Sequence, residues 1–169
     1  MPLLINQRIV TEDPWQLLGQ AALDEGSLLP ENGPVAVPLV WYRQHREALQ
    51  QRNSPLGVIV NGDDDLAALY ADHSQLDLIA VEFPTFRDGR GFSIARQLVR
   101  SGFNRQIRAL GHVTRDRLAL MQSSGFNAFA INDERFQTDH LQAFSEISVN
   151  YQGTAADPRP AFSQRTSTP

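Results

Sequence analysis

Side chains able to do chemistry are concentrated in one stretch, Phe83-Pro84-Thr85-Phe86-Arg87-Asp88-Gly89-Arg90-Gly91. Its glycines permit positive φ and close approach of the backbone to a ligand, and the free amides of a helix that follows attract anions. The residues expected to hold an anion here are Arg90, Gly89, Gly91 and Ser93, joined by Arg108 from a later strand. The alternative is a structural loop in which Asp88 holds Arg90 or a helix amide.

Arg108 is informative because it stands inside the apolar run Ile107-Arg108-Ala109-Leu110. A buried arginine needs a partner, since an isolated buried charge is costly. The acidic residues considered as partners are Glu82, Asp88 and Asp116. Such a pair could face a ligand or could be a purely structural ion pair, and the sequence leaves both open.

Candidate groups for proton transfer lie after the same strands. Asp88, Glu82 and His112 are the catalytic candidates, and histidine titrates close to neutral pH. A loop histidine such as His112 is also compatible with an ordinary surface side chain. Gly111, through close packing, and Asp116, in the first turn of a helix, would support the site from behind.

Composition excludes several kinds of chemistry. The 169-residue chain has no cysteine, and all 15 of its basic residues are arginine. Thiolate catalysis, cysteine-bound metals, lysine Schiff bases and the P-loop lysine are therefore excluded. The four histidines have no zinc spacing, and Asp63-Asp64-Asp65 fits an acidic helix start, so we expect no metal and no cofactor. The net charge of −4 gives no reason to expect nucleic acid.

Alternating strands and helices must position these groups. Strands are expected at 56–60, 77–83, 107–110 and 127–131, and helices at 64–72, 91–100, 114–123 and 133–147. The predicted fold class is α/β, with about four βα units and a mainly parallel sheet that is half-barrel-like or a small open sheet. A complete barrel needs about 250 residues. Ligands of such sheets bind beyond the carboxyl ends of the strands.

The rest of the chain gives a domain plan. An N-terminal hairpin (3–5 and 8–10), a helix starting at Asp13-Pro14 and a helix at 41–52 form a lead-in over 1–55, followed by βα repeats over 56–148. Residues 1–152 are predicted to be one domain and 153–169 a mobile polar tail. No leader or membrane span is visible, so we expect a cytoplasmic protein, and an uncovered half-barrel face would favour a homodimer.

The motif Phe83-Pro84-x-Phe86-x-Asp88-Gly89-Arg90-Gly91-Phe92-Ser93-x-Ala95-Arg96 resembles a bacterial family called domain of unknown function 934. The likeness continues through Arg108-Ala109-x-Gly111, Asp116, Leu118, Gly125-Phe126-x-x-Phe129 and Tyr151-Gln152. This chain has His112, Arg117 and Ser124 where the family often has an acidic residue, glutamine and cysteine. The resemblance implies a role in sulfite reduction, because the family's genes often lie beside that of assimilatory sulfite reductase.

Two functional hypotheses follow. The first is an accessory or partner protein of assimilatory sulfite reduction, which binds the reductase or its electron donor and is not an independent redox catalyst. The chain has no cysteine and no flavin or nicotinamide fingerprint, and cofactors carry redox chemistry. The second is a small enzyme, an oxidoreductase among the options, that binds sulfite, sulfate or phosphate in the Arg/Asp pocket at the strand ends.

Overall fold

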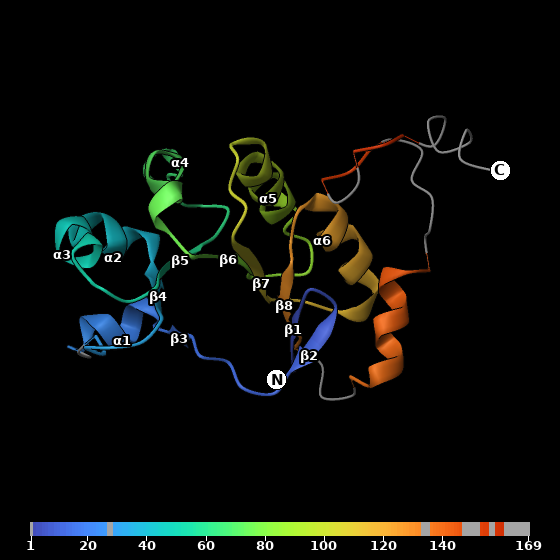
Figure 1. Cartoon of the computed structure of the whole chain (residues 1–169), viewed down its shortest axis with the longest axis horizontal. Helices are drawn as coiled ribbons and strands as arrows, with labels where there is room; N and C mark the ends of the chain where they lie inside the picture. Colours follow the sequence, from blue (N-terminus) through green and yellow to red (C-terminus); the bar gives the residue numbers. More distant parts are fainter. Residues whose placement is uncertain (1, 27–28, 133–135, 147–152, 156–157, 161–169) are drawn as a thin grey trace.

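One eight-stranded sheet organises the computed structural model, which describes residues 2–26, 29–132, 136–146, 153–155 and 158–160 (Figure 1). The strands lie in the order β2-β1-β8-β7-β6-β5-β4-β3. Their bounds are β1 Leu3–Ile5, β2 Arg8–Val10, β3 Gln16–Leu17, β4 Val35–Pro38, β5 Leu56–Val60, β6 Leu78–Phe83, β7 Gln106–Gly111 and β8 Ala128–Ala130.

The sheet is mixed and curls into a half-barrel. Strands β3 to β8 pair in parallel in chain order, whereas β1 pairs antiparallel with both β2 and β8. The expectation of a mainly parallel sheet of about four strands is therefore wrong on both points. The lead-in supplies β3 and β4 at one edge, and the hairpin adds two antiparallel strands at the other.

Helices lie between the parallel strands. Their bounds are α1 Gln20–Asp24, α2 Leu39–Gln44, α3 Arg46–Gln50, α4 Ala67–Asp72, α5 Arg90–Arg100 and α6 Leu118–Ser124, with 3₁₀ helices η1 His73–Gln75, η2 Arg115–Arg117 and η3 Thr138–Phe144. Figure 1 shows α4, α5 and α6 along one side of the sheet. Ile79, Val81 and Phe83 of β6 alternate with residues of the other face and are fully buried.

Several elements differ locally from the predictions. The hairpin is confirmed, but no helix starts at Asp13, whose Oδ1 accepts the amide N–H of Trp15 at 3.1 Å. The helix predicted over 41–52 is two helices that meet at His45. In place of a helix over 133–147 the structure has η3, while 133–135 and 147 lie outside the described residues.

Residues 11–15 cross the sheet face opposite α5. Arg108 lies beside Ala80 in the β6–β7 register, on the face that α5 does not cover, and it pairs with Asp13. A Cβ added to Gly57 of β5 would lie 3.1 Å from the Trp15 ring. The segment that connects β2 to β3 therefore covers part of the inner face of the half-barrel.

The predicted tail begins beside α6. The amide N–H of Ala155 donates to the carbonyl oxygen of Ser123 at 3.0 Å. Residues 156–157 and 161–169 lie outside the described part of the chain, and the tail's mobility stays a prediction.

Across the ranges that the structure describes, no helix combines the length and apolar character needed to cross a bilayer.

Candidate functional site

The loop before α5 forms a closed ion-pair cluster. Arg90 donates from Nη2 to Oδ2 of Asp88 at 2.8 Å and from Nε to Oδ1 at 3.0 Å. Its Nη1 donates to Oδ1 of Asp63, which follows β5. The backbone amide of Arg90 also donates to Asp88, at 3.0 Å. Asp88 therefore holds both the arginine and the first helix amide, as in the structural alternative.

This cluster fixes the charge of Asp88. Hydrogen bonds from the Arg90 side chain, and then from its backbone amide, lower the pKa of Asp88 from 3.8 to about 2. The Asp88 and Asp63 carboxylates in turn raise the pKa of Arg90. A carboxyl group with so low a pKa carries no proton near neutral pH and is a weak base. Asp88 is thus better suited to hold Arg90 than to transfer protons.

Two glycines near the carboxyl ends of the parallel strands, a region called the carboxyl edge, allow close packing. A Cβ on Gly91 would lie 2.6 Å from the Phe83 ring, so the missing side chain lets α5 rest on β6. A Cβ on Gly62 would collide with the Arg90 side chain. Gly89 is exposed, with open space around its Cβ position. Ser93 is exposed on α5 and makes no side-chain hydrogen bond to the described residues.

Arg108 is paired with a residue that the sequence did not indicate. Its Nη1 and Nη2 donate to the two carboxylate oxygens of Asp13 at 2.6 and 3.0 Å. With its amide oxygen turned toward Arg108, Gln106 accepts from Nη2 and Nε at 3.1 and 3.2 Å. The Arg108 side chain is 1% exposed and that of Asp13 is 30% exposed. Asp13 lies 95 residues away in the chain, which is why no local pattern could identify it.

The three acidic residues that the sequence offers as partners of Arg108 are engaged elsewhere or exposed. Glu82 is exposed near the end of β6, and Asp88 pairs with Arg90. Asp116 accepts a hydrogen bond from the Thr114 hydroxyl at 2.6 Å. None of the three candidate acids is the partner of Arg108, which pairs with Asp13 instead.

His112 and Gly111 form the turn after β7. His112 is exposed, and its backbone amide donates to the Phe83 carbonyl at 3.0 Å. Gly111 has φ +80°, and a Cβ there would lie 2.4 Å from the Phe83 carbonyl oxygen. Only glycine fits this backbone without strain. Gly111 therefore lets the turn pack closely on Phe83, and the His112 side chain stays available to solvent.

Arg117 is a central residue that sequence reasoning missed. Its guanidinium carbon lies 4.8, 5.1 and 5.2 Å from the ring centres of Phe83, Phe92 and Phe86. Its Nη1 donates to the His112 carbonyl at 2.9 Å, and burial lowers its pKa. The available signal was an arginine at the start of the apolar run Leu118-Ala119-Leu120, near a phenylalanine-rich loop.

The three adjacent acids after β5 take separate partners. Asp63 pairs with Arg90, and Asp65 with Arg43 at 3.4 Å. Asp64 accepts the Asn61 amide at 2.7 Å. Within the described ranges, no group of three or more His, Asp or Glu side chains is arranged to hold a metal ion.

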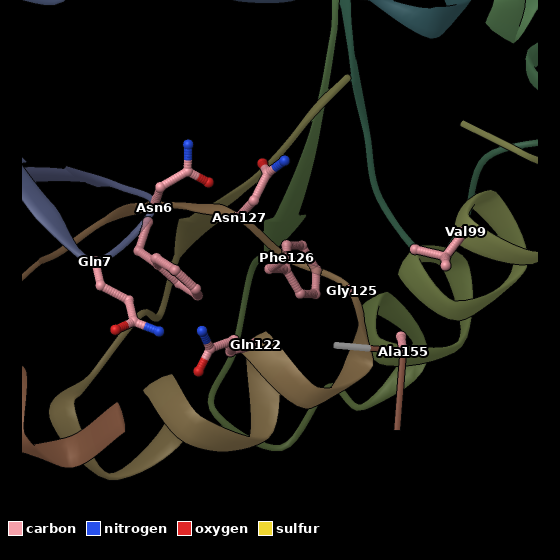
Figure 2. Close-up of a pocket in the computed structure, with 9 residues that line it drawn as sticks. Asn6, Gln7, Val99, Gln122, Gly125, Phe126, Asn127 and Ala155 are labelled. Atoms are coloured by element: carbon pink, nitrogen blue, oxygen red, sulfur yellow. The ribbon is translucent and has the colours of Figure 1, made fainter. Parts of the chain in front are cut away.

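A hollow of about 270 Å³ lies beside the hairpin turn, at the end of the sheet opposite the carboxyl edge (Figure 2). Its lining includes Asn6, Gln7 and Gln122, with Phe126 among its apolar residues. A second hollow of about 410 Å³ is lined by Arg96 and other residues of α5, by Ser123 and by residues 153–155. Neither was predicted, because both depend on segments distant in sequence.

A comparison with known families gives a match over much of the chain. A family model described as a bacterial protein of unknown function, DUF934, matches residues 57–162. The matched range contains the strands from β6 onward and the loops at their carboxyl ends, whereas Asp13 and Arg43 lie outside it. A comparison with curated proteins gives no match to this chain.

Proposed function

The chain belongs to DUF934, a family of bacterial proteins of unknown function, and we propose that it is an accessory or partner protein of assimilatory sulfite reduction. Its role would be to bind the reductase or its electron donor rather than to catalyse a redox step itself. The link to sulfite reduction rests on the family resemblance, and the cytoplasm predicted from the sequence is the proposed location.

One observation supports a binding role over a catalytic one. The two arginines expected to hold an anion are already engaged, Arg90 with Asp88 and Asp63 at the carboxyl edge and Arg108 with Asp13 on the inner face of the sheet. Arginines already held by carboxylates offer few donors to a substrate anion. Groups paired in this way give a rigid surface, which suits docking.

The surface presented at this edge mixes an aromatic side chain with charges. We name the exposed residues around Arg117 the carboxyl-edge patch: Glu82, Phe86, Arg87 and His112. Phe86 is 57% exposed although it stacks on Arg117. Aromatic residues and arginine are the side chains enriched at the energetic centres of protein interfaces. We therefore assign the docking of the partner to this patch.

The proposal is tested with purified proteins. Immobilised wild-type chain is exposed at low salt to purified sulfite reductase and, separately, to its electron donor. The double variant F86A/R87E should lower affinity at least tenfold for the partner that binds, because truncating a central aromatic residue often costs 2 kcal/mol or more (about 30-fold). The matched control is Leu120→Ala, which alters a 50% exposed side chain on α6. Absence of binding to both proteins, or equal binding by the double variant, contradicts the proposal.

A genetic test addresses the pathway independently of the patch. A strain lacking the gene should grow on sulfide or cysteine but poorly on sulfate or sulfite as the sulfur source. Equal growth on all four would contradict a non-redundant role in sulfite reduction.

A small anion-binding enzyme is the second candidate, and the exposure of Glu82 and His112 beside the loop of Arg90 favours it. Sulfite, sulfate or phosphate would then raise the melting temperature. At 100 times its dissociation constant, the bound anion adds about 2.7 kcal/mol to the free energy of unfolding. Arg90→Ala should remove the effect. A shift that survives this substitution would exclude the proposed pocket.

A homodimer is the remaining expectation about partners. Sedimentation velocity of the purified chain over a concentration series tests it, and a single monomer boundary throughout would reject it.

A further inference from the structure

We propose that the groove between the hairpin turn, α6 and α5 binds a nucleoside phosphate, with the base beside Gln7 and Gln122 and the phosphate on Arg96 and Arg100. This groove lies at the end of the sheet away from the carboxyl-edge patch. The proposal is therefore independent of the proposed role in sulfite reduction.

The first half of the groove is the hollow beside the hairpin turn, which we call the amide hollow. The side-chain amides of Asn6, Gln7 and Gln122 line it, and none of them hydrogen-bonds to a described residue. Phe126 and Phe129, 2% and 1% exposed, give it an apolar floor. Free amide donors and acceptors around an apolar floor match the polar edge and flat faces of a nucleobase.

The conformation of the turn supports a use for these amides. Asn6 and Gln7 both have positive φ, 49° and 64°. Two-residue turns of this kind favour glycine at the second position, where the chain has Gln7. A conformation that disfavours the side chain present is a reason to look for a role of that side chain.

The second half is the hollow between α5 and residues 153–155, which we call the arginine hollow. Arg96 and Arg100, one turn apart on α5, both line it. Neither forms an ion pair or hydrogen bond with a described residue, unlike Arg90 or Arg108. Two like charges at this spacing repel each other, and a phosphate dianion between them would relieve the repulsion while accepting their hydrogen bonds.

The two hollows share a wall. Val99 and Ala155 line both of them. Figure 2 shows Gln7 and Gln122 on one side of Phe126, and Val99 and Ala155 on the other. A Cβ on Gly125 would lie 2.6 Å from Val99, so glycine at the end of α6 lets the two helices approach closely there.

The two hollows taken together indicate the class of ligand. At about 270 and 410 Å³, the two hollows together fall within the range of ~300–1,000 Å³ typical of small-molecule sites. Inorganic phosphate would use only the arginines, and a nucleoside only the amides. A nucleoside phosphate uses both halves at once, and linking the halves raises affinity above that of either.

Isothermal titration of the full-length chain with AMP, GMP, CMP and UMP tests the proposal, with adenosine and inorganic phosphate as half-ligands. At least one nucleotide should bind ten times more tightly than either half-ligand. The variant R96Q/R100Q should weaken that nucleotide at least tenfold, because each charge-assisted hydrogen bond contributes about tenfold. Gln7→Gly should weaken it too, while the melting temperature stays equal or rises, since glycine suits the turn.

Arg43→Gln is the matched control, since it removes an exposed arginine of α2 that lines neither hollow and should leave binding unchanged. Three results would overturn the proposal. They are no binding of any nucleotide at about 1 mM, equal binding by R96Q/R100Q, and inorganic phosphate binding as tightly as the nucleotides.

Discussion

Two groups of arginines in this half-barrel differ in whether the chain itself supplies their partners. Arg90 at the carboxyl edge and Arg108 on the inner face of the sheet are each held by carboxylates of this chain, and Arg117 is enclosed by three phenylalanine rings. Arg96 and Arg100, by contrast, line the arginine hollow. The paired charges of Arg90 and Arg108 therefore stabilise the fold, whereas the charges of Arg96 and Arg100 have no partner among the described residues and could bind a ligand.

This contrast shows why the presence of an arginine does not by itself indicate an anion-binding site. An arginine beside a glycine-rich loop fits an anion clamp equally well whether or not a carboxylate already occupies it. Only the partner decides between the two roles, because a guanidinium has a fixed number of donors. Four predictions test this contrast, from the largest expected effect to the smallest.

Asp13→Ala should have the largest effect, a loss of about 3 kcal/mol in the free energy of unfolding, measured by urea denaturation. It leaves the buried charge of Arg108 without its carboxylate. Adding Arg108→Met should recover most of the loss, since a buried pair can be replaced by apolar packing. Glu12→Ala, at an exposed neighbouring carboxylate, should change stability by less than about 0.5 kcal/mol. A similar value for Asp13→Ala would show that the pair contributes little.

Gly91→Ala should lower the free energy of unfolding by about 2 kcal/mol, because its methyl group would press on the Phe83 ring. Gly89→Ala, two residues earlier and facing open space, should stay within about 0.5 kcal/mol. Equal urea midpoints for both variants would mean that the contact of α5 with β6 adapts easily, and that the carboxyl edge is not rigid.

Acid should weaken the cluster around Asp88. The pKa of Asp88 is about 2 in the folded chain against an ordinary 3.8, so the folded state binds this proton more weakly. Its contribution to stability is present above about pH 4 and is lost as the pH falls toward 2. Urea midpoints between pH 5 and 2 should fall less steeply for Asp88→Asn than for wild type. Arg87→Gln should keep the wild-type slope, and parallel curves for Asp88→Asn would refute the pairing.

The smallest effect on stability is expected at the arginine hollow. Arg96→Gln or Arg100→Gln should leave stability unchanged or raise it by about 0.3 kcal/mol, because each removes a like-charge repulsion one helical turn apart. Arg90→Gln, by contrast, should lower the urea midpoint. If Arg96→Gln destabilises the chain as Arg90→Gln does, Arg96 is not the unpaired arginine that the contrast requires.

Local patterns predicted what local interactions control. The hairpin of β1 and β2, and the strands and helices from β5 to α6, follow from runs of apolar residues and their spacing. The Asp88–Arg90 contact is one of the two alternatives that the sequence predicts for this loop, because the residues are two positions apart. The sequence predicts a helix start at Asp13, since nothing local indicates its actual partner, Arg108, which is 95 residues away. The antiparallel position of β1 beside β8 has the same long-range origin.

The sequence by itself determined the alternation of strands and helices, the excluded thiol and lysine chemistry and the membership suggested by the Phe83–Arg96 motif. Only the tertiary structure decided which charges are already satisfied and which face a hollow. The physical reason is that hydrophobic periodicity acts over one turn or strand, whereas burial of a charge depends on any segment that the fold brings to it.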